Sequence, residues 1–61
     1  MTDFIKLYRI DKQEYTLINI KHIIEILGHK SGCTIYLDDN GFGIDVKESI
    51  EQIEKILILY V

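Results

Sequence analysis

The feature that most constrains this chain is an Asn40-Gly41 dipeptide between two segments of alternating apolar and polar residues, 33–39 and 42–46. Asn-Gly supplies the positive φ angles of a type I′ turn, whose twist matches that of two paired antiparallel strands. Successive side chains alternate between the faces of a strand, so the pattern also assigns each residue to a face. It predicts a β-hairpin with a buried face of Ile35, Leu37, Ile44 and Val46 and an outer face of Thr34, Tyr36, Gly43 and Asp45.

A second hairpin is predicted near the beginning of the chain. Residues 4–10 (FIKLYRI) and 14–18 (EYTLI) are rich in β-branched and aromatic side chains, and three polar residues separate them. Two such runs with a short polar break are typical of paired antiparallel strands. Within the first run, Ile5 and Leu7 can share one face, which leaves Phe4, Tyr8 and Ile10 on the other.

The segment between the two hairpins contains one further predicted strand. Asn19 stands before residues 20–22, where its side chain can cap a single helical turn. Residues 23–27 (IIEIL) are apolar and β-branched, which favours a strand. Residues 28–32 (GHKSG) are predicted to form a loop.

The chain is predicted to close with a helix. Ser49 and Gln52 fit the capping-box pattern, in which each side chain accepts a hydrogen bond from the other residue's backbone N–H. Ile50, Ile53, Leu57 and Tyr60 then recur at helical spacing as a core-facing stripe. The predicted fold class is α+β: a single domain, residues 1–61, with a small antiparallel β-meander of four or five strands followed by one C-terminal α-helix.

Size and surplus apolar residues together predict self-association. A domain of about 60 residues buries only about 60% of the surface that its unfolded chain exposes. Cys33 is the single cysteine, so no disulfide can form within one chain. Six apolar residues end the chain, more than one helix stripe can bury. We therefore expect a homo-oligomer whose interface includes Phe4, Tyr8, Ile10, Ile58, Leu59 and Val61.

Charge and hydropathy argue against several classes of protein. The formal net charge is −3, and the Lys and Arg residues are scattered, so nucleic-acid binding is only a distant third hypothesis. No apolar run approaches the roughly 20 residues of a membrane-spanning helix. The start MTDFIKLYRI lacks the pattern of a signal peptide. The expectation is a cytoplasmic protein without membrane contact.

No catalytic or metal-binding motif is present in the sequence. His22, His29, Cys33 and Asp38 lack the paired short spacings of zinc ligands. Segment 38–49 fails as a calcium loop, because Phe42 and Ser49 stand where ligands are required. The thiol of Cys33 is expected to pack in the core. We predict no metal, no cofactor and no enzymatic activity.

One set of side chains could bind a small ligand. Lys6 lies between Phe4 and Tyr8 in the first strand, and Arg9 and Tyr36 complete the same candidate site. Aromatic rings beside a cation can stack a planar anion such as a nucleotide. The predicted ligand-binding residues are Lys6, Tyr8, Arg9 and Tyr36. The alternative is that these rings form the oligomer interface, because interface cores favour aromatic residues.

The order of segments resembles the FlbD-like family of small flagellar and swarming-motility accessory proteins. The similarity runs through FIKLYRI, EYTLIN, HIIEI, TIYLDDNG and IDVKESIEQIEKI, and its strongest part is Val46-Lys47-Glu48-Ser49 followed by Glu51-Gln52-Ile53. The resemblance implies a non-enzymatic accessory protein that acts by binding, with structural roles for Lys47, Glu48 and Ser49. This chain departs from the pattern by ending on KILILYV in place of a charged tail.

Two functions therefore remain open. The first is a non-catalytic, homo-oligomeric binding module that contacts another protein, such as a host protein. The second is a phage- or prophage-encoded sponge that sequesters a small anionic immune signal, such as a cyclic nucleotide, between its subunits.

Overall fold

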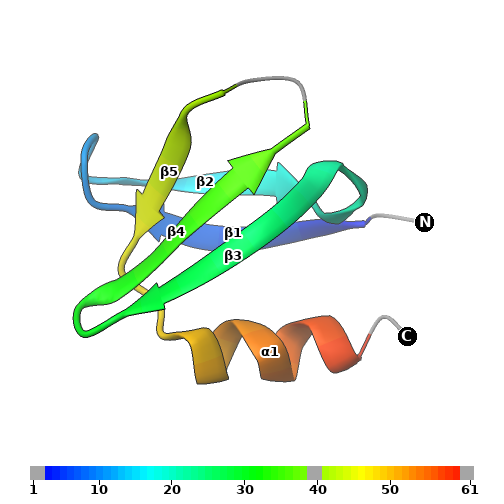
Figure 1. Ribbon diagram of the computed structural model, residues 1–61. Helices are drawn as coiled ribbons and strands as arrows, with labels where there is room; N and C mark the ends of the chain where they lie inside the picture. The colour runs from blue at the N-terminus through cyan, green and yellow to red at the C-terminus, as the bar shows by residue number, and fades with distance from the viewer. Residues whose placement is uncertain (1–2, 39–40, 60–61) are drawn as a thin grey trace.

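A computed structural model describes residues 3–38 and 41–59 of the chain. It confirms the predicted fold class: five antiparallel strands followed by one C-terminal helix (Figure 1). The strands are β1 (Phe4–Arg9), β2 (Glu14–Asn19), β3 (Ile23–His29), β4 (Gly32–Leu37) and β5 (Gly43–Val46). A 3-10 turn, η1 (Ile20–His22), joins β2 to β3, and the helix α1 spans Ile50–Ile58.

The order of strands across the sheet is β2-β1-β5-β4-β3. Strand β5 leaves the β3–β4–β5 meander and pairs with β1, where Arg9 lies opposite Val46. The β1–β2 hairpin and the β3–β4 hairpin form two layers that β5 connects, and α1 lies beneath them (Figure 1). Strands β2 and β3, which are adjacent in sequence, therefore lie at opposite ends of the sheet order.

The β1–β2 hairpin has the faces that alternation predicts. Ile5 and Leu7 are buried, and Ile5 pairs with the buried Ile18 of β2. Phe4 and Ile10 are each nearly half exposed. Gln13 adopts a positive φ of 53° in the connecting turn, a left-handed conformation that is uncommon outside glycine.

The predicted loop at residues 28–32 is wrong. Gly28 and His29 continue β3, and Gly32 already belongs to β4, so His29 pairs with Gly32 across a two-residue connection. Gly32 has a φ of 139°, and a Cβ at this position would collide with the carbonyl oxygen of Val46. Glycine is required here because β4 and the end of β5 approach closely, whereas the sequence pattern indicated a glycine of a loop.

The pairing of β4 and β5 differs from that of a two-residue turn at Asn40-Gly41. Such a turn would pair Leu37 with Ile44, whereas the structure pairs Ile35 with Ile44. Asp39 and Asn40, and thus the predicted type I′ turn itself, lie outside the described residues. The difference in register is two residues, an even number, so the predicted faces are retained. Ile35, Ile44 and Val46 are buried, and Leu37 is half-buried.

Helix α1 begins with the predicted capping box. The Ser49 hydroxyl accepts a hydrogen bond from the Gln52 N–H at 3.2 Å, and the Gln52 side-chain oxygen accepts one from the Ser49 N–H at 2.9 Å. Asn19 likewise caps η1, since its Oδ1 accepts a hydrogen bond from the Lys21 N–H at 3.0 Å. Both caps satisfy backbone donors that the first helical turn leaves without partners.

The buried stripe of α1 is narrower than predicted. Ile53 is 1% exposed, and Leu57 is half-buried, but Ile50 is 37% exposed. Ile56, which the predicted stripe omitted, packs against the core. Tyr60 lies outside the described residues. The helix can start close to β3 because Gly28 has no side chain: a Cβ there would lie 3.1 Å from the Cβ of Ile50.

The core is small and aliphatic. It comprises Ile5, Leu7, Ile18, Cys33, Ile35, Ile44, Val46 and Ile53. Six partly buried apolar side chains extend it: Ile20, Ile23, Ile26, Leu37, Ile56 and Leu57. Within the described parts of the chain, no helix has the length and apolar character needed to span a membrane.

Candidate binding surfaces

The outward side of the first hairpin forms one candidate surface, which we call the outer hairpin face. Pairing across the two strands places Lys6 opposite Leu17 and Tyr8 opposite Tyr15, on the side away from the core. Tyr15 is 58% exposed and Leu17 is 65% exposed. With the partly exposed Phe4, these residues present aromatic and aliphatic surface beside a lysine. The outer hairpin face is defined as Phe4, Lys6, Tyr8, Tyr15 and Leu17.

The two tyrosine rings of this face are held by their neighbours. Their centroids lie 5.1 Å apart at an interplanar angle of 78°, an edge-to-face arrangement. The Lys6 Nζ lies 4.8 Å from the centroid of the Tyr15 ring, and the Lys47 Nζ lies 5.1 Å from that of the Tyr8 ring. Each ring thus has a cation within the distance at which cation–π attraction operates. The face thus combines two rings with the ammonium group of Lys6, and Lys47 adds a second ammonium group from the segment after β5.

The segment after β5 ties this face to the rest of the sheet. Tyr8 donates its backbone N–H to the Glu48 carboxylate, at 3.0 and 3.2 Å from the two oxygens. The Tyr8 carbonyl oxygen accepts a hydrogen bond from the Lys47 N–H at 3.0 Å. The Lys47-Glu48-Ser49 segment, for which the family resemblance implied a structural role, therefore bonds to β1 on one side and caps α1 on the other.

Arg9 does not project with Lys6 and Tyr8. It has the strand parity of Ile5 and Leu7, so it lies on the other face of β1. Its Nη2 and Nε donate to the two Asp11 carboxylate oxygens at 2.7 and 3.1 Å. These hydrogen bonds raise the pKa of Arg9 and lower the pKa of Asp11.

Tyr36 is also separated from the predicted ligand site. Arg9, Val46 and Cys33 lie level with one another on β1, β5 and β4. Lys6 comes before Arg9 on β1, whereas Tyr36 comes after Cys33 on β4. Strands β1 and β4 run in the same direction, because each is antiparallel to β5. Lys6 and Tyr36 therefore lie toward opposite ends of the sheet. Of the four predicted ligand-binding residues, the outer hairpin face contains Lys6 and Tyr8.

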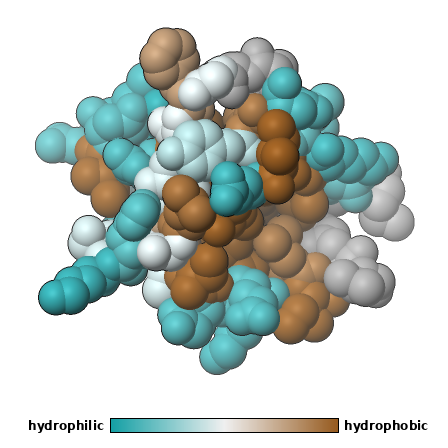
Figure 2. All heavy atoms as spheres, viewed as in Figure 1, coloured by the Kyte–Doolittle hydropathy of each residue, from teal (hydrophilic) through white to brown (hydrophobic). Residues whose placement is uncertain are grey.

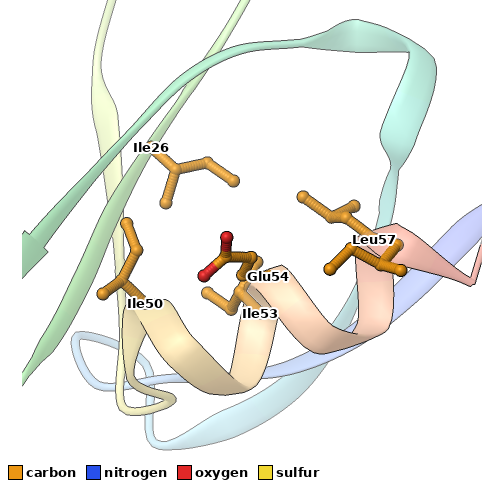
Figure 3. A pocket seen from close by; sticks show the side chains of 6 residues that line it. Ile26, Ile50, Ile53, Glu54 and Leu57 are labelled. Carbon is orange, nitrogen blue, oxygen red and sulfur yellow. The ribbon is translucent and has the colours of Figure 1, made fainter.

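A second candidate surface is the groove between the helix and strand β3, which we call the α1–β3 groove. It has a volume of about 390 Å³ and is lined by Ile26, Ile50, Ile53, Glu54, Leu57 and Ile58. Ile26 points from β3 toward the helix, and the Glu54 carboxylate rises from α1 among the aliphatic side chains (Figure 3). Apolar side chains reach the molecular surface along β3 and α1 (Figure 2). No sequence pattern pointed to this groove, because it depends on how α1 docks against β3.

The predicted oligomer-interface residues are divided between several places. Phe4 and Tyr8 belong to the outer hairpin face, whereas Ile58 lines the α1–β3 groove and Leu59, next to it, is 82% exposed. Ile10 lines a separate hollow of about 340 Å³ with His29 and Asp45. Val61 lies outside the described residues.

Two residues that line this hollow, His29 and Asp45, are joined by hydrogen bonds through Thr34. Thr34 Oγ1 donates to Asp45 Oδ1 at 2.7 Å and lies 2.8 Å from His29 Nε2. Because its proton is directed to Asp45, Thr34 accepts a hydrogen bond from His29, which carries a proton on Nε2. In a Ser-His-Asp triad the nucleophilic hydroxyl instead donates to the imidazole, so this order of donors differs from that of a triad. Alternation places Thr34 and Asp45 on one face, but the mistaken loop assignment left His29 out.

Cys33 is a core residue, as expected from the sequence. It is 2% exposed, and burial, together with the negative charges of Glu51 and Glu48, raises the pKa of its thiol. A protonated buried thiol is a poor nucleophile. His22 pairs with the Asp38 carboxylate at 3.1 Å on the surface. Among residues 3–38 and 41–59, no three His, Cys, Asp or Glu side chains converge as metal ligands.

Comparisons with family models, with curated proteins and with solved structures find no match to this chain.

Proposed function

We propose that this protein is a non-catalytic binding module that forms a homo-oligomer and acts by contacting another protein. One observation carries the proposal: among its described residues, the chain exposes more large hydrophobic residues than it buries in its core. In the described part of the chain, eight hydrophobic residues are buried, whereas ten large hydrophobic residues are exposed. Exposed apolar surface that gathers into patches is characteristic of interaction sites. The FlbD-like sequence pattern is consistent with such an accessory role.

The outer hairpin face is the better candidate for self-association. Its two most exposed apolar residues, Tyr15 and Leu17, lie on the edge strand β2, opposite Tyr8 and Lys6 of β1. Tyrosine offers a large contact area with few rotatable bonds, and aromatic residues are enriched in interface cores. In a twofold dimer the same patch occurs on both subunits, so a lysine of one copy can meet a ring of the other.

Two arrangements support the absence of catalysis. Thr34 directs its proton to Asp45, and the thiol of Cys33 is buried with a raised pKa. The order of donors at Thr34 differs from that of a Ser-His-Asp triad, and a protonated, buried thiol is a poor nucleophile.

Measurement of the mass in solution tests the proposal. Sedimentation equilibrium at micromolar concentration is expected to give a multiple of the 7.2 kDa chain mass. Leu17→Lys places an ammonium group opposite Lys6 in the outer hairpin face and is expected to shift the protein toward the monomer. Leu59→Lys makes the same change at the exposed end of α1, outside the outer hairpin face, and serves as the matched control for Leu17→Lys. A fully folded wild-type protein of single-chain mass would refute the proposal.

Sequestration of a small anionic ligand is a second candidate function. The observation that favours it is the placement of the Lys6 and Lys47 ammonium groups against the Tyr15 and Tyr8 rings. Such a surface can attract a phosphate and stack a base, as a cyclic nucleotide sponge between subunits requires.

A thermal-shift assay with a panel of cyclic nucleotides tests this second function. At about 100 times the dissociation constant, a ligand that binds only the folded state stabilises it by about 2.7 kcal/mol, which should raise the melting temperature of so small a domain by more than about 10 °C. The double substitution Lys6→Gln with Lys47→Gln should remove the shift, whereas Lys12→Gln, in the exposed turn, should retain it. No shift with any member of the panel would exclude cyclic nucleotides as ligands.

A further inference from the structure

Strand β3 is an edge strand beside an apolar groove. It pairs with β4 and ends the sheet order, so its other edge is not paired with any strand of the described residues. At seven residues it is long for an edge strand, and its exposed side chains include Ile24 at 67% and Leu27 at 40%. Folded proteins usually protect a long apolar edge with charge, proline or a covering element, because an unpaired strand edge accepts another strand.

The shape of the α1–β3 groove suits an extended chain. The groove lies between β3 and the helix, with Ile26 on one wall and Ile50 and Leu57 on the other (Figure 3). A strand added to the free edge of β3 would direct alternate side chains toward the apolar helix wall. The volume of about 390 Å³ lies within the range of sites that accommodate side chains or small ligands.

Charge narrows the chemistry of the occupant. Glu54 is the charged residue that lines the groove, and its carboxylate projects among the aliphatic side chains (Figure 3). Glu25, the acidic residue of β3, is exposed but does not line the groove. Bringing an acidic or purely aliphatic segment into this groove would leave the Glu54 carboxylate without a countercharge. A lysine or arginine side chain on the incoming strand can supply that charge.

We infer that the α1–β3 groove is the docking site for an extended segment of a partner protein in which aliphatic residues alternate and at least one lysine or arginine is present. The segment adds to β3 as a further antiparallel or parallel strand, its aliphatic side chains contact Ile50 and Leu57, and its cation pairs with Glu54. The inference rests on the proposed function, because it names the surface and the kind of partner through which the module acts.

Selection from a library of random nine-residue peptides displayed on a carrier tests the inference even though the partner is unidentified. The full-length protein is expected to enrich peptides with aliphatic residues at every second position and a Lys or Arg among them. Enrichment of acidic peptides, of helical-period peptides, or of none would overturn the inference.

Matched variants locate the binding of a selected peptide, measured by fluorescence anisotropy. Glu54→Gln is expected to weaken binding by about three- to fivefold, as for a partly exposed ion pair. Glu51→Gln removes the same charge outside the groove and should have no effect. Ile58→Lys places a cation in the groove and should weaken binding at least about tenfold, whereas Leu59→Lys, one residue later, should not. If Glu51→Gln weakens peptide binding as much as Glu54→Gln does, the peptide does not bind in the α1–β3 groove. The same conclusion follows if Leu59→Lys weakens binding as much as Ile58→Lys does.

Backbone methylation distinguishes an added strand from other occupants. A strand at a sheet edge uses the N–H groups of alternate residues only. Two sets of methylated peptides are compared, one with methyl groups on the amides of odd-numbered residues and one with methyl groups on those of even-numbered residues. One set should lose binding, and the other should retain it. Equal effects of the two sets of methyl groups on binding would rule out strand addition.

The mass of Ile58→Lys separates this inference from the proposed function. If Ile58→Lys becomes monomeric, the groove is covered by a second copy of the chain, and the inference of a peptide partner fails while self-association stands. If the wild-type protein is an oligomer but selects no peptide, the inference also fails while self-association stands.

Discussion

The outer hairpin face and the α1–β3 groove are both apolar, but they are built in different ways. The hairpin face is formed by β1 and β2, whose residues lie close together in the sequence, and its rings are held by each other and by lysines. The groove is formed by β3 and α1, which are joined through β4 and β5 and meet where Ile50 approaches Gly28. The first surface is a product of local pairing, whereas the second depends on the docking of the helix.

This difference has a physical consequence for stability. Six backbone-paired positions connect β1 to β2, and the pairs on the core side include the buried Ile5 and Ile18. The helix, in contrast, is attached mainly by side-chain packing, and Ile53 is its one fully buried residue among those described. Local opening of the helix should therefore remove the groove and leave the hairpin face in place.

The largest expected effect is from Ile53→Ala. Removing a fully buried isoleucine side chain beyond Cβ should lower the free energy of unfolding by about 2–5 kcal/mol. In native-state hydrogen exchange, amides of α1 should lose protection before those of β1 and β2. Ile58→Ala, at a 60% exposed position of the same helix, should change stability by less than about 0.5 kcal/mol. Equal losses of protection in hairpin and helix would show that the two regions unfold together.

Glu48→Ala should have the next largest effect, and it acts on the hairpin side. The substitution removes the carboxylate that accepts the Tyr8 N–H, and a hydrogen bond to a charged group contributes about 1.5–3 kcal/mol. Urea denaturation should show the loss. Glu48→Gln keeps an acceptor oxygen and should cost less. If the two variants are equally destabilised, the Tyr8 hydrogen bond is not the reason for the effect.

Ser49→Ala tests the start of the helix and should cost about 1 kcal/mol, the usual contribution of an N-cap side chain. The lost acceptor leaves the Gln52 N–H without its cap, and the first turn, which carries Ile50 into the groove, should fray. Circular dichroism should report reduced helicity, while Ser49→Thr should restore most of it. An unchanged helix content in Ser49→Ala would mean that packing alone maintains this turn.

The smallest expected effect is the pH dependence from Asp11, in the turn of the first hairpin. Arg9 lowers the pKa of Asp11 in the folded protein, so the pair stabilises the fold above the ordinary carboxyl pKa of about 3.9. This contribution should disappear as the pH falls through the lowered, folded-state pKa. The difference in urea midpoint between wild type and Asp11→Asn should therefore be present at pH 6 and vanish in strong acid. Because the pair is exposed, salt should reduce the difference; a difference independent of pH would contradict the ion pair.

Sequence patterns predicted the buried strand faces and the start of the helix correctly. Alternation assigned Ile5, Leu7, Ile35 and Val46 to the buried side, and all are buried. The pattern around Ser49 predicted a capping box, and both of its hydrogen bonds are present. These features involve residues that are near one another in the chain or that follow the period of a strand, so their spacing alone specifies them.

The candidate site was predicted only in part, for reasons of register and parity. Lys6 and Tyr8 share a face because they are two residues apart, whereas Arg9 has the opposite parity. Tyr36 also points outward, but it lies on β4. The sequence of a single strand does not show how far along the sheet its residues lie relative to those of β1. The position of Glu54 at the groove was missed for a similar reason: Glu54 is an exposed helix residue, and only the docking of α1 against β3 places Ile26 on the other side of the groove.

By itself, the sequence determined which strand residues are buried, where the caps lie and that a series of strands precedes one helix, because alternation, helical period and capping depend on neighbours in the chain. The tertiary structure decided that β5 pairs with β1, that β2 and β3 are the edges of the sheet and that α1 forms a groove with β3. These arrangements follow from contacts between residues distant in sequence, such as Arg9 with Val46, whose energies depend on how all the elements pack together.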